Sequence, residues 1–450
     1  MEDMKKINIP ENANRIIHTL QSAGYEAYIV GGCVRDAVLG KEPDDWDITT
    51  SAKPEQVKVL FRRTIDTGIA HGTVTVMFGK EGYEVTTYRI DGKYEDHRRP
   101  TNVTFTRSLL EDMKRRDFTI NAMAYNDEEG LIDHFEGMKD LERHRIRCVG
   151  DPAERFDEDA LRILRAVRFA AQLDFSIEEK TREAIARQAQ YLKDISAERI
   201  QVELTKLLLS EHPERLHTAY ELGVTAVVLP EFDRMMETTQ NNKHHMYSVG
   251  EHTLLVVEGV SPTKALRWAA LLHDVAKPIT KTTDENGDHF YGHNEKGVEM
   301  ARDVLKRLKF DNATIDRVKR LVLWHDYGMG ERPSLRTFRK GLSRMGADLF
   351  EEYVEIKRAD ILAQSAYMRK EKLQNVDQLE QYYRQIMEEE QCLSLKDLAV
   401  TGKDLMEDGM QPGRELGQVL QYLLECVLES PEKNRRDILL ELAREWKDVR

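Results

Sequence analysis

The stretch Tyr28-Ile-Val-Gly-Gly-Cys-Val-Arg-Asp36 decides how the N-terminal part of the chain folds. Its first three residues are β-branched or aromatic and predict a short strand. Gly31 and Gly32 permit a tight turn and a close approach of the backbone to a ligand, and residues 34–39 predict a helix. Backbone N–H groups at such a turn bind phosphate, and Arg35 can add a forked donor. The stretch therefore predicts a phosphate-binding turn.

An acidic run, Asp44-Asp-Trp-Asp-Ile-Thr49, follows this turn. If residues 46–49 form a strand, Asp45 and Asp47 point to the same face, because side chains alternate along a strand. Two carboxylates beside a phosphate site suit Mg²⁺, and a pair of such ions can activate a hydroxyl and stabilise leaving pyrophosphate. We expect both aspartates to be catalytic and to bind Mg²⁺. Glu84, on a predicted neighbouring strand, is either a third carboxylate of this site or a solvent-facing residue.

The two motifs in this order resemble the head of the class II tRNA nucleotidyltransferases and bacterial poly(A) polymerases, within the polymerase-β-like superfamily. A further segment, Arg115-Arg-Asp-Phe-Thr-Ile-Asn-Ala122, resembles the family's third motif, whose second arginine, here Arg116, meets the nucleotide. The resemblance implies three triphosphate-binding residues in the head: Gly32, Arg35 and Arg116.

Residues 158–169, Glu-Asp-Ala-Leu-Arg-Ile-Leu-Arg-Ala-Val-Arg-Phe, have the apolar period of a helix. Side chains spaced three apart would share one face of this helix: Asp159, Arg162, Arg165 and roughly Arg168. Taken alone, this pattern is better explained by an amphipathic helix with Asp–Arg pairs in water. The segment also resembles the family's templating motif, and residues 196–208 resemble its neck helix. The resemblance implies base-reading by Asp159 and Arg162 and nucleotide contacts by Arg165 and Arg168.

An Asp/Arg pair can select bases without a nucleic-acid template. A carboxylate accepts from the exocyclic amine of cytosine or adenine, and a guanidinium donates to a ring nitrogen or carbonyl. Guanine and uracil place a carbonyl there, and an unpaired buried carboxylate costs about 1–3 kcal/mol. The resemblance implies template-independent addition of CMP and AMP to the tRNA 3′ end, completing CCA from CTP and ATP.

Three alternatives remain open at this point: addition of only A or only CC, a poly(A) polymerase, and an HD phosphohydrolase whose head binds RNA. CC-adding relatives lack part of the loop between the second and third motifs. This chain keeps that loop, Asp91–Thr106, within a polar stretch (residues 91–107), which favours full or A-adding activity.

A second set of residues follows the order found in the HD phosphohydrolase superfamily: His252, His273, Asp274, His293, His325 and Asp360. The resemblance implies a metal site formed by His252, His273, Asp274 and Asp360, which lowers the pKa of a bound water. His293 and His325 would support a second ion or bind the substrate phosphate. Mg, Mn, Ni, Co and Fe all remain possible metals. The expected substrates are terminal or 2′,3′-cyclic phosphates on RNA ends, which suits repair before extension.

At 450 residues the chain is long enough for about three domains. We predict an α+β fold: a polymerase-β-like nucleotidyltransferase head with a mixed sheet and helices, followed by an all-α body containing an HD domain. The predicted divisions are a catalytic head, a helical neck with the templating helix, an HD domain and a helical, tRNA-binding tail: 1–150, 151–230, 231–365 and 366–450. Strands over 131–135 and 145–149 are expected to close the head.

The net charge of −13 argues against wholesale wrapping of nucleic acid, although local basic clusters remain, and no DNA partner is expected. No stretch of about 18 apolar residues occurs, and the first residues lack an apolar signal core, so no membrane partner or export is expected. The four cysteines form no C-x-x-C pair and suggest free thiols in a reducing cytoplasm.

Overall fold

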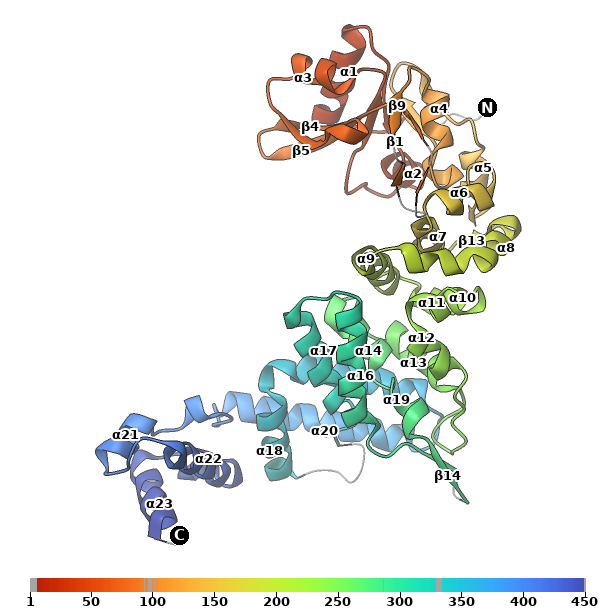
Figure 1. Cartoon of the computed structure of the whole chain (residues 1–450). Helices are drawn as coiled ribbons and strands as arrows, with labels where there is room; N and C mark the ends of the chain where they lie inside the picture. Colours follow the sequence, from red (N-terminus) through yellow and green to blue (C-terminus); the bar gives the residue numbers. More distant parts are fainter. Residues whose placement is uncertain are drawn as a thin grey trace. The chain divides into compact units, whose positions relative to one another are not determined.

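The computed structural model describes residues 6–92, 94–95, 99–100, 102–285, 287–328 and 334–448. The chain divides into two compact units, residues 1–230 and 231–450. The first unit contains a mixed sheet with helices, and the second is almost entirely helical (Figure 1). The predicted α+β fold, a mixed-sheet head followed by a helical body, is therefore confirmed, and the assignment of an HD domain within that body stays a prediction. The finer four-part division stays a prediction.

The first unit is built on a seven-stranded sheet with the order β11-β10-β1-β2-β5-β4-β3. Its strands are β1 Ala27–Val30, β2 Ile48–Thr50, β3 Thr64–Gly68, β4 Thr73–Phe78, β5 Glu81–Thr87, β10 Ala124–Asn126 and β11 Gly130–Ile132. β2 and β5 pair in parallel, and the other neighbouring strands pair antiparallel. Every residue of β1 and β2 is buried, so the strands next to the glycine turn form a rigid centre.

Short helices flank this sheet: α1 Glu11–Ser22, α2 Gly32–Val38, α3 Pro54–Leu60, α4 Leu109–Lys114 and α5 Gly137–Glu142. α1 buries one stripe, Ala13, Ile16, Ile17 and Leu20, at the spacing of an amphipathic helix. Leu109 and Met113 of α4 pack with Tyr28 and Val30 of β1 in one apolar cluster. The cluster connects α4, which leads into the third motif, to the strand that precedes the glycine turn.

Two expectations for the head need correction. The stretch 91–107 contains short strands, with β6 Arg89–Asp91 paired to β9 Val103–Phe105 and β7 Tyr94–Glu95 paired to β8 Arg99–Pro100. Residues 93, 96–98 and 101 of that stretch lie outside the described part. The segment 145–149 is also not a partner of 131–135: β12 Arg145–Ile146 pairs in parallel with β13 Ser176–Ile177.

The rest of the first unit is helical: α6 Pro152–Glu158, α7 Leu161–Leu173, α8 Glu179–Gln188, α9 Ala197–Leu208, α10 Leu216–Glu221 and α11 Thr225–Val228. α7 packs against α9, and α6 packs against α8. The predicted continuous helix over 158–169 is wrong. α6 ends at Glu158, Asp159 is extended with φ −139° and ψ 101°, and α7 begins after Ala160.

The second unit begins with a group of packed helices: α12 Pro230–Met236, α13 Val249–Glu258, α14 Lys264–Leu272, α15 Lys277–Thr280, α16 His293–Arg307, α17 Asn312–Trp324, α18 Leu335–Met345 and α19 Phe350–Ala363. A hairpin, β14 Thr282–Asp284 and β15 Gly287–His289, leaves this group. The long helix α20 Arg369–Glu388 packs on α19. α13, α14, α17 and α19 contact one another and enclose the centre of the group.

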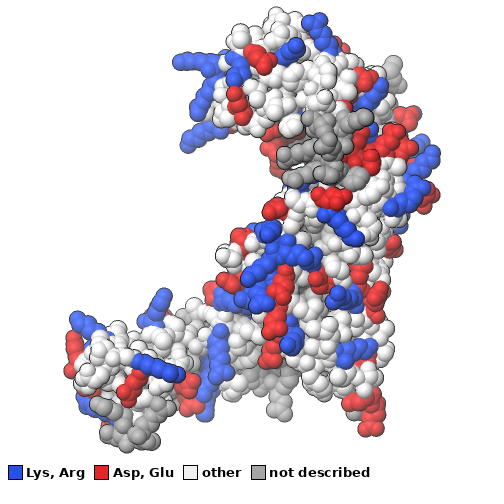
Figure 2. Space-filling view, in the orientation of Figure 1, with Lys and Arg blue, Asp and Glu red and all other residues white. Residues whose placement is uncertain are grey.

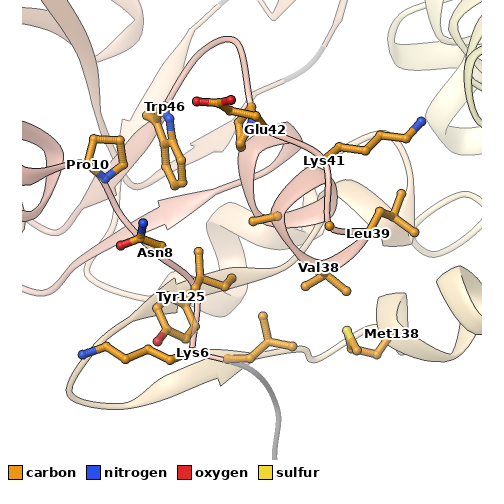
Figure 3. Close-up of a pocket in the computed structure, with 15 residues that line it drawn as sticks. Lys6, Asn8, Pro10, Val38, Leu39, Lys41, Glu42, Trp46, Tyr125 and Met138 are labelled. Carbon is orange, nitrogen blue, oxygen red and sulfur yellow. The ribbon is translucent and has the colours of Figure 1, made fainter.

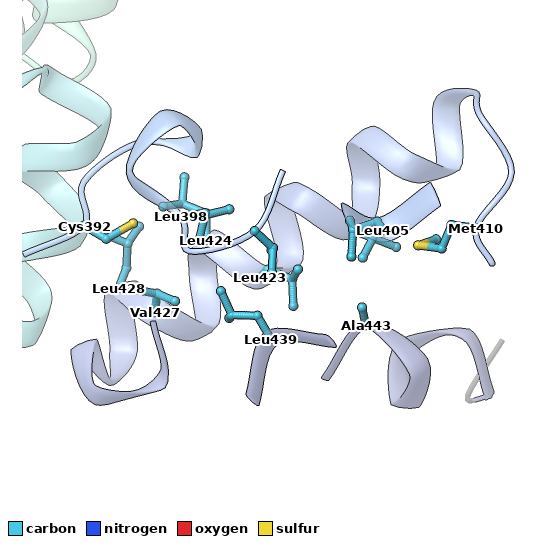
Figure 4. Packing of buried hydrophobic residues seen from close by; sticks show 12 residues of the cluster. Cys392, Leu398, Leu405, Met410, Leu423, Leu424, Val427, Leu428, Leu439 and Ala443 are labelled. Carbon is cyan, nitrogen blue, oxygen red and sulfur yellow. The ribbon is translucent and has the colours of Figure 1, made fainter. Parts of the chain in front are cut away.

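The last helices, α21 Gly402–Glu407, α22 Arg414–Glu429 and α23 Arg436–Asp448, share a small core of their own. Figure 4 shows Leu405, Leu423 and Leu439 meeting in this core, and Cys392 and Met410 lie at its edges. On the face shown in Figure 2, Lys and Arg gather in separate groups among acidic and uncharged residues. None of the described helices combines the length and apolar character that a membrane span requires.

Candidate functional site

The glycine turn after β1 has the geometry that the sequence predicts. Gly31 has φ +85°, in the left-handed region that favours glycine. A Cβ atom at Gly31 would lie 3.1 Å from a terminal nitrogen of Arg116, so this guanidinium packs directly on the turn. The Nε atom of Arg116 is buried without a hydrogen-bond partner, and its terminal nitrogen lies 3.7 Å from Asp112. Burial and the charge of Arg115 lower the pKa of Arg116.

Asp47 is held at the edge of the turn by the sheet. The strand β2 begins at Ile48, later than expected, but the pairing with β1 continues because the Val30 N–H donates to the Asp47 carbonyl over 3.0 Å. The parallel register between β2 and β5 aligns Ile48 with Val85. The preceding residues, Asp47 and Glu84, therefore lie side by side on neighbouring strands.

Asp45, Asp47 and Glu84 influence one another electrostatically. Neighbouring protein atoms remove water from the Asp47 carboxyl and thereby raise its pKa. The negative charge of Asp45 adds to this rise, and the positive charge of Arg116 opposes it. Loss of solvation, then Asp47 and Asp45, raise the pKa of Glu84. Glu84 is exposed and lies beside Asp47 on the neighbouring strand, so both of its expected roles fit this position.

Trp46 lies on the other side of the segment. It lines a pocket of about 780 Å³, and Figure 3 shows its ring beside Pro10 and near Asn8. No predicted site residue lines this pocket. Trp46 therefore lines a pocket whose lining includes neither of the two aspartates that flank it in sequence.

Arg35 is engaged within the protein. Its guanidinium donates to both oxygens of Asp36 and to Asn121 Oδ1, each over 2.8 Å, and it lies 5.0 Å from the ring centre of Phe169 in α7. Only 9% of Arg35 is exposed. These contacts tie α2 to the third motif and to α7, and they leave less of the fork for phosphate than the sequence suggests.

The predicted base-reading residues do not pair with each other. The Asp159 carboxylate accepts from the Arg199 guanidinium over 2.8 and 3.3 Å and from the Leu161 N–H over 3.1 Å. Arg162 donates to the carbonyls of Arg115, over 2.8 Å, and Arg155, over 3.0 Å. Arg199, at the start of α9, was not predicted as a site residue, because it is distant from Asp159 in sequence.

Arg165 and Arg168 form ion pairs that connect α7 to other elements. Arg165 donates to Asp117 over 2.8 and 2.6 Å; burial alone would raise the pKa of Asp117, but Arg165 outweighs it and lowers the pKa to about 2. Arg168 donates to Glu203 of α9 over 2.5 Å. Both guanidinium groups lie over Phe169, at 5.2 and 3.9 Å from the ring centre. The face predicted to meet nucleotide is therefore also a structural junction.

The second unit holds a buried cluster of histidine and aspartate side chains. Two groups, His252–His273–Asp274 and Asp274–His293–His325, each place their ligand atoms within 4.8 Å of one another and share Asp274. The Nδ1 atoms of His273, His293 and His325 lie 2.7 to 2.8 Å from backbone carbonyls. This anchoring directs the Nε2 atoms toward the shared carboxylate.

The remaining predicted ligand, Asp360, lies 2.9 Å from the Nε2 atom of His252. Burial would lower the pKa of His273 and raise that of Asp274, but their mutual contact reverses both shifts. Lys277, which the sequence analysis did not assign to the site, lies 2.7 Å from Asp274. All four predicted ligands thus meet, and His293 and His325 join them.

Three family matches cover most of the chain. Residues 27–147 match the poly A polymerase head domain, residues 174–236 the probable RNA and SrmB-binding site of polymerase A, and residues 293–443 the putative tRNA nucleotidyltransferase domain 2. The chain is 36% identical over 430 residues to a CCA-adding enzyme of Lactobacillus helveticus, with 94% of each chain covered. It is 37% identical to that of Lactiplantibacillus plantarum, covering 96% of this chain and 95% of the relative.

Solved structures agree with these matches. The CCA-adding enzyme of Bacillus stearothermophilus in complex with CTP matches with a TM-score of 0.72 and 30% identity, over 97% of this chain and 98% of that one. The Thermotoga maritima enzyme complexed with tRNA_CCA shares the fold, with a TM-score of 0.58 and 21% identity over 98% and 97% of the two chains. The chain therefore belongs to the family of CCA-adding enzymes and is a nucleotidyltransferase.

Proposed function

We propose that this chain completes the CCA sequence at the 3′ end of tRNA, using CTP and ATP and no nucleic-acid template. Each step joins the tRNA 3′-hydroxyl to the α-phosphate of the nucleotide and releases pyrophosphate. The observation that carries the proposal is the glycine turn with Arg116 on one side and the coupled carboxylates Asp45, Asp47 and Glu84 on the other. The full-length relatives named CCA-adding enzymes support it.

The family implies a divalent metal in the head, and the residues present fit Mg²⁺. Asp45 and Asp47, with Glu84 beside them, would hold it, since carboxylate oxygens are the ligands that Mg²⁺ prefers. Loss of solvation, and after it the charges of the neighbouring carboxylates, raises the pKa of Asp47 and of Glu84, and a bound cation would stabilise the charged forms of both. When bound, the ion stabilises charge on the phosphate oxygens and favours the hydroxyl as nucleophile.

The other head residues position the nucleotide. Gly31 leaves room for Arg116 against the turn, where the guanidinium can donate to the triphosphate. Gly32 begins α2 and would let the phosphates approach the backbone closely. Arg35 would act mainly by holding α2 against Asn121 and Phe169, and its contact with phosphate is indirect in this arrangement.

Asp159 and Arg162 are the proposed base-reading residues. The extended backbone at Asp159 places its carboxylate between two helices rather than on the face of one. Arg199 holds that carboxylate through two donors in the absence of a base. A cytosine or adenine amine would then meet an acceptor that is already oriented, while a carbonyl would meet one that repels it.

Nucleotide addition to defined tRNAs tests this proposal. Purified protein is incubated with tRNA lacking CCA, CC-ended tRNA and mature tRNA, each with one labelled nucleoside triphosphate at a time. Full activity adds C, C and A in order and then stops. Addition of A alone, of CC alone, or of a long A tail on unrelated RNA would replace the proposal by one of its rivals, and no extension would reject it.

We also propose a metal-dependent phosphohydrolase activity in the second unit, on terminal or 2′,3′-cyclic phosphates of RNA ends. The observation favouring it is the pair of buried ligand groups that share Asp274. The Nε2 atoms of His252 and His273 and one Asp274 oxygen are buried without a well-directed hydrogen bond, although Asp360, Asp274 and Lys277 lie within ion-pair distance of them. Buried ligand atoms that face one another in this way are expected of a metal site. Imidazole and carboxylate ligands admit Mg, Mn, Ni, Co or Fe.

Phosphate release from 3′-phosphorylated and 2′,3′-cyclic RNA ends, measured with each metal in turn, tests the hydrolase. A His273→Ala variant is the control, because it removes one ligand without touching the head. Release that is equal in both proteins, or absent with every metal, rejects the activity. The four-part domain division and a cytoplasmic location remain predictions that accompany these two functions.

A further inference from the structure

A pocket of about 650 Å³ opens over the histidine–aspartate cluster. Its lining includes Asp274, His293, His325 and Asp360 from the cluster. Much of the remaining lining comes from a segment before α13, from β15 and the residues just after it, and from the helix α20. The pocket therefore brings additional side chains to the ligand cluster.

Lys372 reaches this pocket from α20. Its ammonium donates to Gln364 Oε1 over 2.5 Å and lies 3.2 Å from His244 Nδ1. Gln364 in turn donates to the proposed metal ligand Asp360 over 3.0 Å. Lys372 is half-buried and lines the pocket, and Gln364 connects its ammonium to the ligand cluster.

A second lysine comes from residues 241–245, which we call the strap. Lys243 lies 4.5 Å from the ring centre of Tyr367 and lines the pocket. The strap is fixed at both ends, because the Ser365 N–H donates to the His244 carbonyl over 2.8 Å and the Asn241 N–H donates to Asp288 over 2.7 Å. The fixed backbone holds Lys243 at the pocket, where its exposed, flexible side chain can reach a bound anion.

His289 at the end of β15 and Tyr291 just after it add an aromatic surface to the pocket. Tyr291 is 77% exposed and lies parallel to the His289 ring, with 5.4 Å between ring centres. Both residues line the pocket. A large aromatic ring is unfavourable in contact with water, but it offers a face on which a base can stack. Single-stranded nucleic acids are commonly bound by such stacking.

We propose that this pocket binds the terminal phosphate of an RNA strand, with Lys372 and Lys243 as phosphate-binding residues and Tyr291 stacking on the last base. The acidic side chains at the floor suit cations, and the lysines of α20 and the strap suit the phosphate oxygens above them. This inference rests on the proposed phosphohydrolase function of the same site. A free phosphomonoester presents the same phosphate, so the experiment separates the two sources.

Binding of short fluorescent RNA to the full chain tests the inference. Three probes are compared: RNA with a 3′-phosphate, the same RNA with a 3′-hydroxyl, and inorganic phosphate as competitor. The wild type should prefer the phosphorylated RNA, and Lys372→Gln should reduce this preference by about tenfold, as expected for one charge-assisted contact. Lys370→Gln, a change at an exposed lysine of the same helix, should leave it unchanged.

Tyr291→Ala separates RNA from a free phosphate. This variant should bind the phosphorylated RNA several-fold more weakly, because its last base has lost the ring on which it stacks. Competition by inorganic phosphate, which carries no base, should be unchanged. If inorganic phosphate competes as well as RNA of equal concentration, the site takes a small phosphate and the RNA assignment is overturned. If Lys372→Gln and Lys370→Gln behave alike, the phosphate assignment is overturned.

These outcomes differ from failure of the hydrolase. If the wild type prefers phosphorylated RNA but releases no phosphate with any metal, the proposed hydrolase activity is rejected and the proposed binding site stands. In an active enzyme, Lys372→Gln should raise KM about tenfold with kcat largely kept, because the lysine contacts the phosphate in the bound substrate and the transition state alike. A fall in kcat with unchanged KM would contradict the binding role.

Discussion

The two acidic sites of this chain are prepared for their ions to different degrees. In the second unit, the ligand atoms around Asp274 already lie within 4.8 Å of one another, and the imidazole rings are held by backbone carbonyls. In the head, Asp45, Asp47 and Glu84 are exposed, and across the described residues the groups of three closely spaced ligands occur only in the second unit. A buried, pre-assembled cluster suits a resident ion, whereas open carboxylates suit ions that arrive with a triphosphate.

The largest effect should come from the open site. Asp47→Asn is expected to reduce nucleotide addition by about 1000-fold or more, because it removes a ligand that stabilises charge in the transition state. The single-turnover rate of CMP addition to tRNA lacking CCA measures this. Asp44→Asn changes an exposed neighbour outside the proposed ligand set and is the matched control.

Asp47→Asn should leave folding intact, since the side chain is exposed and its strand is held through backbone hydrogen bonds. An unchanged addition rate would show that Asp47 is not a ligand, and the comparison between the sites would then fail. Loss of the folded state in Asp47→Asn would show that the carboxylate is structural.

The buried site should respond to Asp274→Asn. This change removes the carboxylate shared by both ligand groups, so affinity for a transition metal should fall by at least about 100-fold. Metal content after dialysis measures it, with Asp316→Asn on the surface of α17 as control. Addition of CMP to tRNA should be unaffected. If Asp274→Asn lost CMP addition together with metal binding, the two sites would not be assembled independently.

A smaller effect concerns base choice. Asp159→Ala should lower the preference for CTP and ATP over UTP and GTP by about 10- to 100-fold, the worth of one unpaired buried acceptor, and slow the chemical step less. The ratios of kcat/KM for the four nucleotides measure this, and Glu154→Ala on α6 serves as control. Unchanged selectivity would reject Asp159 as a template residue.

Arg199→Ala should reproduce part of the Asp159→Ala effect, because Arg199 orients the same carboxylate. Arg199→Lys should restore selectivity in part through its single donor. A loss of stability in Arg199→Ala without a change in selectivity would assign this ion pair to folding alone.

The smallest effect is a pH dependence at Glu84. A carboxyl whose pKa is raised by folding favours the folded state below its ordinary value of 4.5, and this contribution is lost as pH rises through the shifted pKa. Glu84→Gln should therefore stabilise the metal-free protein at neutral pH, by about half a kcal/mol for such a solvent-exposed group, and not below pH 4.5.

Thermal unfolding across this pH range measures the Glu84→Gln effect, with Glu81→Gln, an exposed acid of the same strand, for comparison. Added Mg²⁺ should remove the advantage of glutamine at neutral pH, because the cation neutralises the repulsion among the three carboxylates. A stabilisation that persists below pH 4.5 or in the presence of Mg²⁺ would show that the charge on Glu84 is not its cause.

Residues close in sequence were predicted more accurately than contacts between distant segments. The turn at Gly31 and the strand before it depend on local backbone preferences, and both occur as expected. The helix break at Asp159 was missed, because the apolar period of 158–169 continues through it while the backbone does not. The partnership of β12 with β13 was missed for a related reason, since pairing between distant segments leaves no periodic signal.

The sequence by itself determined the glycine turn, the acidic residues behind it and the ordered histidines and aspartates of the second unit, because these follow from residue chemistry and spacing. Only the tertiary structure decided that Asp159 is held by Arg199, that Arg35 is turned toward Asn121 and Phe169, and that Lys372 reaches the histidine–aspartate pocket. Each of these contacts joins segments far apart in the chain. Their geometry depends on how whole elements pack, which the local order of residues does not encode.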